Sequence, residues 1–276
     1  MSEIREKVKS LIPQPLLAVM RETRDGLKRA SEWPGATFHP WRRDSIARLA
    51  SLKDSRRGER CFVIGNGPSL KQTDLSRLRN ENTIGMNRIY LMFPDLGFEI
   101  SYLVTVNDLV IEQCAGDLQN LDMPRFVSWR SRQWLRPDPN LYFLHTTYTG
   151  PKFAKDVTGR LWEGATVTYV SLQLAYHLGF SEVILIGVDH SFTSKGKPNT
   201  TVVSQGDDPN HFDPGYFGKG FRWQLPDLDT SEVAYQRARL AFEADGRRIM
   251  DATVGGKLQV FPKVDYVSLF GQGREG

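Results

Sequence analysis

Short apolar runs, each ending in a glycine or a polar side chain, recur along the chain and predict the buried strands of a sheet. Between some of these runs, apolar residues at helical spacing predict helices. Strands that alternate with helices are typical of a parallel sheet joined by right-handed crossovers. The expected fold is therefore α/β and Rossmann-like, a mostly parallel sheet flanked by helices. The predicted strands occupy residues 60–64, 83–87, 101–106, 124–128, 140–144, 182–189 and 248–252, and the helices 108–118, 166–178 and 231–246.

The N-terminal part of the chain has a different pattern. Helical spacing predicts one helix within residues 1–35, which Trp33-Pro34-Gly35 interrupts, and a second over residues 41–54. The first strand begins only after this part. We therefore expect a helical N-terminal extension, residues 1–58, followed by one catalytic domain, residues 59–276.

Length and composition agree with a globular protein that has one large domain, or one domain plus an appendage. The 276 residues are 40% hydrophobic and 25% charged, which is ordinary for globular proteins. We find no apolar stretch of about 18 residues and no secretory signal, so a cytoplasmic protein is expected. The two cysteines, Cys61 and Cys114, exclude a disulfide framework and a cysteine zinc site.

The net charge of +4 is concentrated in the N-terminal part. Residues 1–60 contain 14 Lys and Arg against 8 Asp and Glu. One interpretation is a solvated helical face, and the other is attraction to an anionic partner or to the inner face of the membrane. Without zinc-finger spacing or an aromatic-basic platform, we do not expect nucleic acid as a partner.

Polar side chains follow several of the predicted strands directly. Ligands of open α/β sheets bind at the carboxyl ends of the strands, so these side chains are candidates for a binding site. The same placement after four strands is more informative than a single instance would be. The candidates are Asn66, Asn87, Asn107, Asp108, Asp189 and His190.

The turn after the first strand, residues 65–70, is the most distinctive motif. Gly65 and Gly67 allow a tight turn and a close approach to a ligand, and Pro68 redirects the chain. Ser69 is expected to cap a following helix whose free N–H groups favour a phosphate. The third glycine of the dinucleotide fingerprint and the lysine of a P-loop are both missing. Nucleotide binding by another type of loop and a plain tight turn therefore both remain open.

The long polar segment at residues 190–230 is expected to be a functional or mobile loop. His211 lies there among carboxylates, and either His211 or His190 is a candidate general base. Tyr216, Lys219 and Arg222 are candidates for contacts to a sugar or a phosphate. The alternatives are solvated histidines and a lid that packs only its own aromatic rings. Asp227-Leu228-Asp229 matches the Asp-x-Asp pattern of metal-dependent transferases, but it follows Pro226 in a loop, so we expect no metal site.

Residues 63–70, Val-Ile-Gly-Asn-Gly-Pro-Ser-Leu, resemble the first strand and turn of the bacterial family 42 sialyltransferases. They equally resemble a broad group that contains motility-associated flagellin glycosylation factors and archaeal pterin pyrophosphokinases. Residues 166–189 look like a helix and a strand of the same fold. Asn87 and Asn107 match two further strand ends. The resemblance covers roughly residues 60–255 and implies a sialyltransferase-like variant of the GT-A fold.

The resemblance also implies roles for individual residues. Asn66, Asn87 and Asn107 would hold the cytidine monophosphate (CMP) part of a donor, and His211 would be the general base. The Ser-Gly that begins the helix in the sialyltransferases is replaced here by Val167-Thr168, so Thr166 and Thr168 are the nucleotide candidates. Loop tyrosines assist the departing phosphate in that family. No tyrosine lies between Tyr176 and Tyr216, which makes Tyr216 the candidate substitute.

We therefore expect a metal-independent, inverting glycosyltransferase that needs no cofactor. Its donor would be a nucleotide-activated sugar, with a CMP-linked acidic sugar as one candidate. Its acceptor would be a glycan, a glycolipid or a protein such as flagellin. One rival is an ATP-dependent pyrophosphokinase of a pterin-like alcohol, in which Mg²⁺ would use Asp108, Asp189 or Asp229. The other rival is a non-catalytic nucleotide-binding scaffold.

Overall fold

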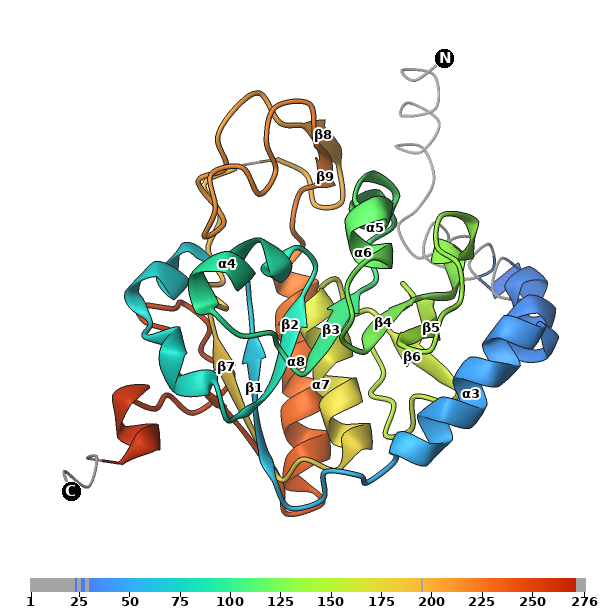
Figure 1. The fold of residues 1–276 in the computed structure, drawn as a ribbon, viewed down its shortest axis with the longest axis horizontal. Coiled ribbons are helices and arrows are strands. Elements are labelled where there is room, and N and C mark those ends of the chain that lie inside the picture. Colours follow the sequence, from blue (N-terminus) through green and yellow to red (C-terminus); the bar gives the residue numbers. More distant parts are fainter. Residues whose placement is uncertain (1–22, 24–25, 28–29, 195, 272–276) are drawn as a thin grey trace.

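The computed structural model describes residue 23 and residues 26–27, 30–194 and 196–271. Its centre is an eight-stranded sheet in the order β10-β7-β1-β2-β3-β4-β5-β6, and every neighbouring pair in it is parallel. This confirms the Rossmann-like α/β fold (Figure 1). The strands are β1 (Arg60–Ile64), β2 (Asn82–Met86), β3 (Tyr102–Thr105), β4 (Arg125–Ser128), β5 (Leu141–Thr147), β6 (Arg160–Trp162), β7 (Glu182–Ile186) and β10 (Arg248–Asp251).

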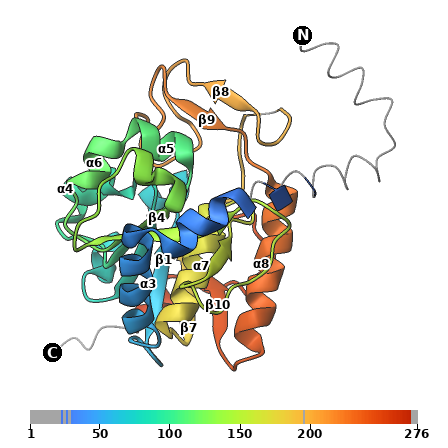
Figure 2. The ribbon, with the colours of Figure 1, turned by 90° about the vertical axis from the view of Figure 1, so that its right-hand side faces the viewer.

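Both faces of the sheet are buried, which is why its strands are nearly continuous apolar runs. Along β1, Cys61 and Val63 belong to one hydrophobic core, and Phe62 and Ile64 belong to the other. The helices α7 (Val167–Leu178) and α8 (Leu228–Glu243) pack against the first core, and short helices cover the second (Figures 1 and 2).

The strand order reverses next to β1. The chain runs outward from β1 to β6, and α7 then returns it to β7 on the other side of β1. Such a switch point opens a crevice at the carboxyl ends of the two strands, where ligands of this fold class bind. The sequence motif at residues 65–70 follows β1 and therefore lies at this crevice.

The N-terminal extension is not separate from the domain where it is described. Residues 30–38 are helical, so the break expected at residues 33–35 lies instead at His39, whose side chain accepts a hydrogen bond from Trp41 N. The next helix, α3 (Pro40–Leu52), packs on β5, and its Ser45 Oγ accepts a hydrogen bond from Phe143 N. The rest of the basic arm lies outside the described residues.

Several expected elements differ from those observed. The segment at 108–118 forms two short helices that meet at Cys114, and α8 begins before Ser231 because Asp227 is its N-cap. A five-residue 3-10 helix, not an α-helix, follows the Gly65 turn. The shorter elements are η1 (Pro68–Gln72), η2 (Leu75–Leu78), η3 (Ile89–Met92), α4 (Phe93–Leu96), α5 (Asp108–Gln113), α6 (Ala115–Gln119), η4 (Trp129–Gln133) and η5 (Val267–Phe270).

The long polar segment forms a lid, residues 190–227, above the carboxyl edge of the sheet (Figure 1). It contains an antiparallel hairpin, β8 (Thr201–Val203) and β9 (Arg222–Gln224), that the sequence did not predict. The lid is attached to α5 because the Gln113 side chain bonds both the N–H and the carbonyl of Arg222. Aromatic rings of the lid stack on one another, as in the pair Phe217 and Trp223, whose centroids are 5.6 Å apart.

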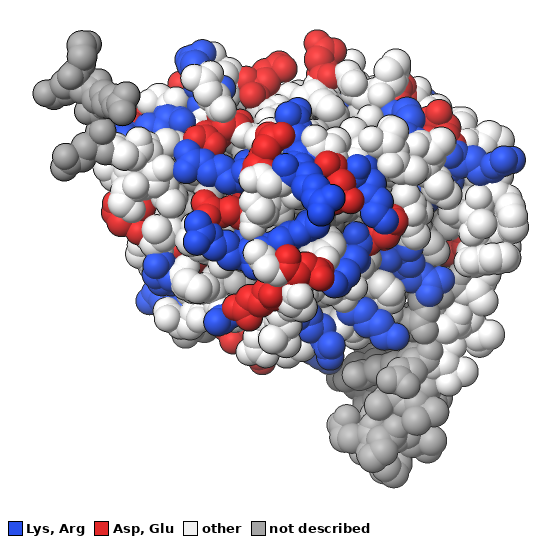
Figure 3. All heavy atoms as spheres, turned by 90° about the horizontal axis from the view of Figure 1, so that it is seen from below, with Lys and Arg blue, Asp and Glu red and all other residues white. Residues whose placement is uncertain are grey.

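The opposite edge of the sheet has a mixed surface. Basic and acidic side chains alternate there without a large area of one sign (Figure 3). Many are paired, for example Lys53 with Asp156 at 2.8 Å and Arg60 with Glu81. In the part of the chain that the structure describes, every helix is too short or too polar to cross a bilayer.

Candidate active site

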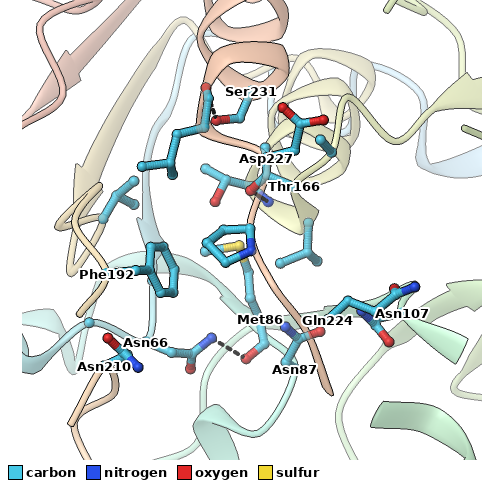
Figure 4. Close-up of a pocket in the computed structure, with 18 of the residues that line it drawn as sticks. Asn66, Met86, Asn87, Asn107, Thr166, Phe192, Asn210, Gln224, Asp227 and Ser231 are labelled. Carbon is cyan, nitrogen blue, oxygen red and sulfur yellow. Dashed lines mark hydrogen bonds between the residues drawn. The ribbon is translucent and has the colours of Figure 1, made fainter. Parts of the chain in front are cut away.

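A pocket of about 260 Å³ lies at the switch point, between the sheet edge and the lid. Its wall combines the turn after β1, the ends of β2, β3 and β7, the first residues of α7 and α8, and parts of the lid (Figure 4). Four of the five non-glycine residues with left-handed backbone in the described chain line it: Asn87, Ala165, His190 and Asn199. Such conformations cost free energy and tend to gather at ligand sites.

The turn needs glycine at two positions because the chain that follows β7 lies very close to it. A Cβ on Gly65 would lie 2.1 Å from the carbonyl oxygen of Gly187, and one on Gly67 would lie 1.8 Å from Asp189 Oδ2. Backbone hydrogen bonds from Gly65 N to Ile186 O and from Gly67 N to Gly187 O fix this approach. The turn is therefore close-packed against the end of β7, and both glycines still line the pocket.

Ser69 and Asp189 do not take the roles expected from the sequence. The Asp189 carboxylate accepts hydrogen bonds from Ser69 N at 3.1 Å and from Ser69 Oγ at 2.7 Å. Ser69 is buried, and neither it nor Pro68 lines the pocket. Ser69 N and Oγ are therefore already engaged by Asp189, which does not support the phosphate cradle that the sequence predicts at the start of the following helix.

The three strand-end asparagines lie together on the pocket wall, as the sequence predicts (Figure 4). Asn66 donates from Nδ2 to Met86 O at 3.1 Å, and Asn107 caps α5 by accepting from Leu109 N. The Oδ1 atoms of Asn66 and Asn87 are buried without a partner among the described residues. Buried acceptors are nearly always paired, so these two oxygens suit N–H or O–H groups of a ligand.

The helix that begins at the pocket is α7. Gly164 and Ala165 have left-handed backbone, and Thr166 is the N-cap, accepting from Thr168 N at 3.3 Å. Ala165, Thr166 and Thr168 line the pocket. The free N–H groups and the dipole of a helix N-terminus favour an anion, so this end of the pocket is suited to a phosphate.

His211 lies on the lid and lines the pocket. Its Nδ1 is 2.7 Å from Oδ2 of the buried Asp208, and its ring stacks on Tyr216 with centroids 4.0 Å apart. Phe212 N donates to Asn66 O at 2.9 Å, which ties this part of the lid to the turn. The ring's Nε2 has no hydrogen bond to a described residue. The arrangement brings the imidazole of His211 close to the turn at residues 65–70.

His190 occupies another part of the same wall. Its Nε2 is 2.9 Å from Glu232 Oε1 on α8, and its ring meets Tyr235 edge-on with centroids 6.1 Å apart. The Tyr235 hydroxyl is 3.4 Å from Thr166 Oγ1. The sequence could not choose between the two histidines, and the structure shows that each has a carboxylate partner of its own.

Four sequence candidates lie away from the pocket surface. Tyr216 is fully buried behind His211, and burial raises the pKa of its hydroxyl well above the usual range. Its hydroxyl accepts from Arg88 N, so the predicted contact with a departing phosphate is not supported. Arg222 pairs with Glu112 at 3.0 Å, and Lys219 is exposed. Neither of these cations lines the pocket, and neither does Asp108, which faces Arg130.

Sequence reasoning named Asp108 but missed the partly buried charge network that it forms at the ends of β4 to β6. Arg130 is 2.8 Å from Asp108, 2.8 Å from Glu163 and 2.8 Å from the Tyr148 hydroxyl. Burial raises the pKa of the Glu163 carboxyl, and Arg130 opposes that effect. Glu163 and Tyr148 line the pocket. No local signal identifies this network, because its members are far apart in the sequence.

The charge of the wall is unusual for a phosphate-binding pocket. Within the described residues it includes no lysine and no arginine, while Glu163, Asp189 and Asp227 contribute carboxyl groups. Asp227 is engaged as the N-cap of α8, accepting from Thr230 N. The described part of the chain has no group of three or more His, Cys, Asp or Glu side chains placed to hold a metal ion.

Residues 42–195 match the model of a protein family described as 6-hydroxymethylpterin diphosphokinase MptE-like. The match covers more than half of the sequence. The chain belongs to this family. The region that it shares with the MptE-like family includes the turn, the three asparagines, the start of α7 and His190. Asp208 and His211 lie beyond the matched residues.

Among solved structures, the MAf glycosyltransferase from Magnetospirillum magneticum AMB-1 is similar, with a TM-score of 0.49 and 16% sequence identity. The similarity covers 93% of this MptE-like chain and 43% of the other, so the chain spans less than half of that protein. No curated protein matches the sequence.

Proposed function

We propose that this chain is an inverting glycosyltransferase that transfers a sugar from a nucleotide donor to a hydroxyl group without a metal ion. The observation that carries the proposal is the pair formed by Asp208 and His211, whose imidazole lines the same pocket as Asn66 and Asn87. A histidine held by a carboxylate at one nitrogen can accept a proton at the other.

In this reaction, Asp208 orients the ring and stabilises the charge that His211 gains. His211 Nε2 takes the proton of the acceptor hydroxyl as its oxygen bonds to the anomeric carbon. The bond from that carbon to the phosphate oxygen breaks on the opposite side, and a single displacement of this kind inverts the configuration. A positioned base of this type contributes about 10²- to 10⁴-fold to a rate.

The nucleotide would lie along the sheet edge. The unpaired Oδ1 atoms of Asn66 and Asn87 suit the N–H and O–H groups of a base and a ribose. The start of α7, at Thr166 to Thr168, suits the phosphate. Because no lysine or arginine of the described chain lines the pocket, a donor with one phosphate is favoured over one with three. CMP-linked sugars, which the motif resemblance implies, are therefore the first donor class to test.

The family description favours a second candidate, transfer of a diphosphate from ATP to a hydroxymethyl pterin with Mg²⁺. His211 could deprotonate that alcohol as well. Magnesium, however, prefers free carboxylate oxygens. Asp189 is bound to Ser69 and Asp108 to Arg130, while Asp229 lies in the first turn of α8 and does not line the pocket. These contacts favour the sugar transferase over the kinase.

A nucleotide panel separates the candidates. We would measure the melting temperature of the protein with CMP, UMP, GDP, UDP and ATP, each with Mg²⁺ and with EDTA. A ligand that binds only the folded state at a hundredfold excess over its Kd adds about 2.7 kcal/mol of stability. We expect a shift with CMP that EDTA does not change. A shift with ATP alone, dependent on Mg²⁺, would favour the kinase.

The acceptor and the membrane association are tested separately. If the acceptor is a glycolipid, we expect the basic N-terminal arm to increase binding to vesicles that contain anionic lipid, since each basic residue near such a surface adds about 1 kcal/mol. Sedimentation of the full chain with anionic and neutral vesicles, at low and high salt, tests this. Equal binding to both vesicle types would contradict it.

A further inference from the structure

The proposed transfer produces a negative charge on the departing phosphate, and His211, which takes the acceptor proton, does not stabilise it. When the sugar leaves, negative charge develops on the phosphate, and preorganised donors or cations must stabilise it. The described pocket wall offers no lysine or arginine, and three of its residues are acidic. Two imidazoles line the wall, and His211 is the one that takes the acceptor proton. The remaining imidazole belongs to His190.

The surroundings of His190 place it near the phosphate end of the pocket. Its Nε2 is 2.9 Å from Glu232 Oε1, and its ring contacts Tyr235, both from α8. Tyr235 in turn reaches Thr166, the N-cap of α7, at 3.4 Å. These contacts connect His190 to the helix start that suits the phosphate. The left-handed backbone of His190, at φ 53°, is a strained conformation that this packing maintains.

The hydrogen-bonding pattern defines which nitrogen is available. With Nε2–H directed at the Glu232 carboxylate, Nδ1 is the second donor of a protonated ring. Nδ1 makes no hydrogen bond to a described residue. The Glu232 carboxylate orients the ring through this contact. This arrangement resembles the pair of Asp208 and His211 in composition, but its carboxylate comes from α8 and not from the lid.

We propose that His190, oriented by Glu232, binds and stabilises the departing phosphate. This inference rests on the proposed function. As the acceptor oxygen bonds to the anomeric carbon, its proton passes to His211. The electron pair of the broken bond stays on the phosphate oxygen, and protonated His190 donates a hydrogen bond from Nδ1 to that phosphate. His211 then releases its proton to solvent, and the nucleotide leaves as its monophosphate.

The test measures what the phosphate adds to nucleotide binding. We would determine by calorimetry the Kd values of CMP and of cytidine for the wild type and for His190→Gln. We expect His190→Gln to weaken CMP binding about tenfold or more, the size of one charge-assisted hydrogen bond, and to leave cytidine binding unchanged. If another monophosphate binds better in the nucleotide panel, it and its nucleoside replace this pair.

Two further variants keep the result interpretable. His211→Gln is the matched control, because it removes the other pocket imidazole and should leave the ratio of the CMP and cytidine Kd values unchanged. Glu232→Gln should raise the ratio of the CMP Kd to the cytidine Kd as His190→Gln does, but by less, because the Glu232 side chain is half exposed and an amide still accepts from Nε2. If His190→Gln does not fold, Glu232→Gln with an unchanged ratio overturns the inference by itself.

The outcomes separate this inference from the proposed function. An unchanged ratio in folded His190→Gln, in a protein whose wild type binds CMP and transfers sugar, overturns only the role of His190. A wild type that binds CMP no better than cytidine contradicts the phosphate site at α7, and the proposed function with it. An equal loss of CMP and cytidine binding would indicate that His190 only maintains the shape of the pocket, and would also overturn the inference.

Discussion

The two sides of the pocket are built in different ways. On the sheet side, the Gly65 turn and the end of β7 are joined by backbone hydrogen bonds and by a spacing that only glycine permits. On the lid side, His211 is positioned by side chains, by the Asp208 carboxylate and the Tyr216 ring. One backbone hydrogen bond, from Phe212 N to Asn66 O, connects them. The proposed binding groups therefore belong to the sheet edge, while the proposed base belongs to the lid above it.

The largest effect is expected when His211 on the lid is replaced, which tests whether binding and catalysis are divided between the two sides. We expect His211→Gln to lower the rate of sugar transfer by about 10²- to 10⁴-fold, because it removes the base. Nucleotide affinity should be unchanged, because the asparagines and α7 remain. Kinetics and calorimetry on the same preparation measure both. A variant that loses nucleotide binding in proportion to activity would show that the two sides are not independent.

A substitution in the turn on the sheet side should lower the stability of the protein. In Gly65→Ala, the added Cβ would meet the backbone of Gly187, which cannot move without disturbing β7. We expect a loss of about 3 kcal/mol or more in the free energy of unfolding, measured in urea. Gly116→Ala is the matched control, since Gly116 lies in α6 with nothing within 4 Å of its Cβ position. Equal stability of the two variants would contradict close packing at the turn.

Acid should also lower the stability of the sheet, through His145 in β5. Burial, with help from Arg160, lowers the pKa of His145 from 6.5 to about 4. The unfolded chain therefore binds a proton there that the folded protein does not, between these two pH values. Stability should be complete above pH 6.5 and fall toward pH 4, by roughly 2 kcal/mol from this group. Denaturation in urea across this range measures it, and His145→Gln should flatten the profile. An identical slope in the variant would exclude His145 as the cause.

The smallest effect is expected behind the lid histidine. Tyr216→Phe keeps the ring that stacks on His211 and removes only a buried hydroxyl. We expect a change in transfer rate of less than about threefold, because that hydroxyl does not line the pocket. Steady-state kinetics at saturating donor measure it. A loss comparable to that of His211→Gln would show that the hydroxyl takes part in the chemistry.

The sequence predicted the sheet side better than the lid side for a physical reason. Buried parallel strands are continuous apolar runs, and their carboxyl ends share one edge, so the positions of Asn66, Asn87 and Asn107 follow from local patterns. The hydrogen bond from Ser69 to Asp189 does not follow from a local pattern, because Asp189 lies 120 residues later.

The remaining errors have the same origin. Arg130 finds its partner Glu163 through a contact between distant segments, and Tyr216 is buried by rings of the lid and by Arg88. The sequence predicts the start of this helix at Ser231, whereas Asp227, part of the weak Asp-x-Asp pattern, is the N-cap of α8. In each case the local sequence pattern identified a polar or aromatic candidate, but contacts with distant segments determine what that residue binds.

The central claim is tested most directly by the fate of a nucleotide sugar. We would follow CMP-, UDP- and GDP-linked sugars with the wild type in EDTA by NMR, using water or an added glycan as the acceptor. The account predicts release of the nucleotide and a product of inverted anomeric configuration, both lost in His211→Gln. Retained configuration, equal activity in His211→Gln, or AMP formation from ATP only with Mg²⁺ and a pterin alcohol would contradict it.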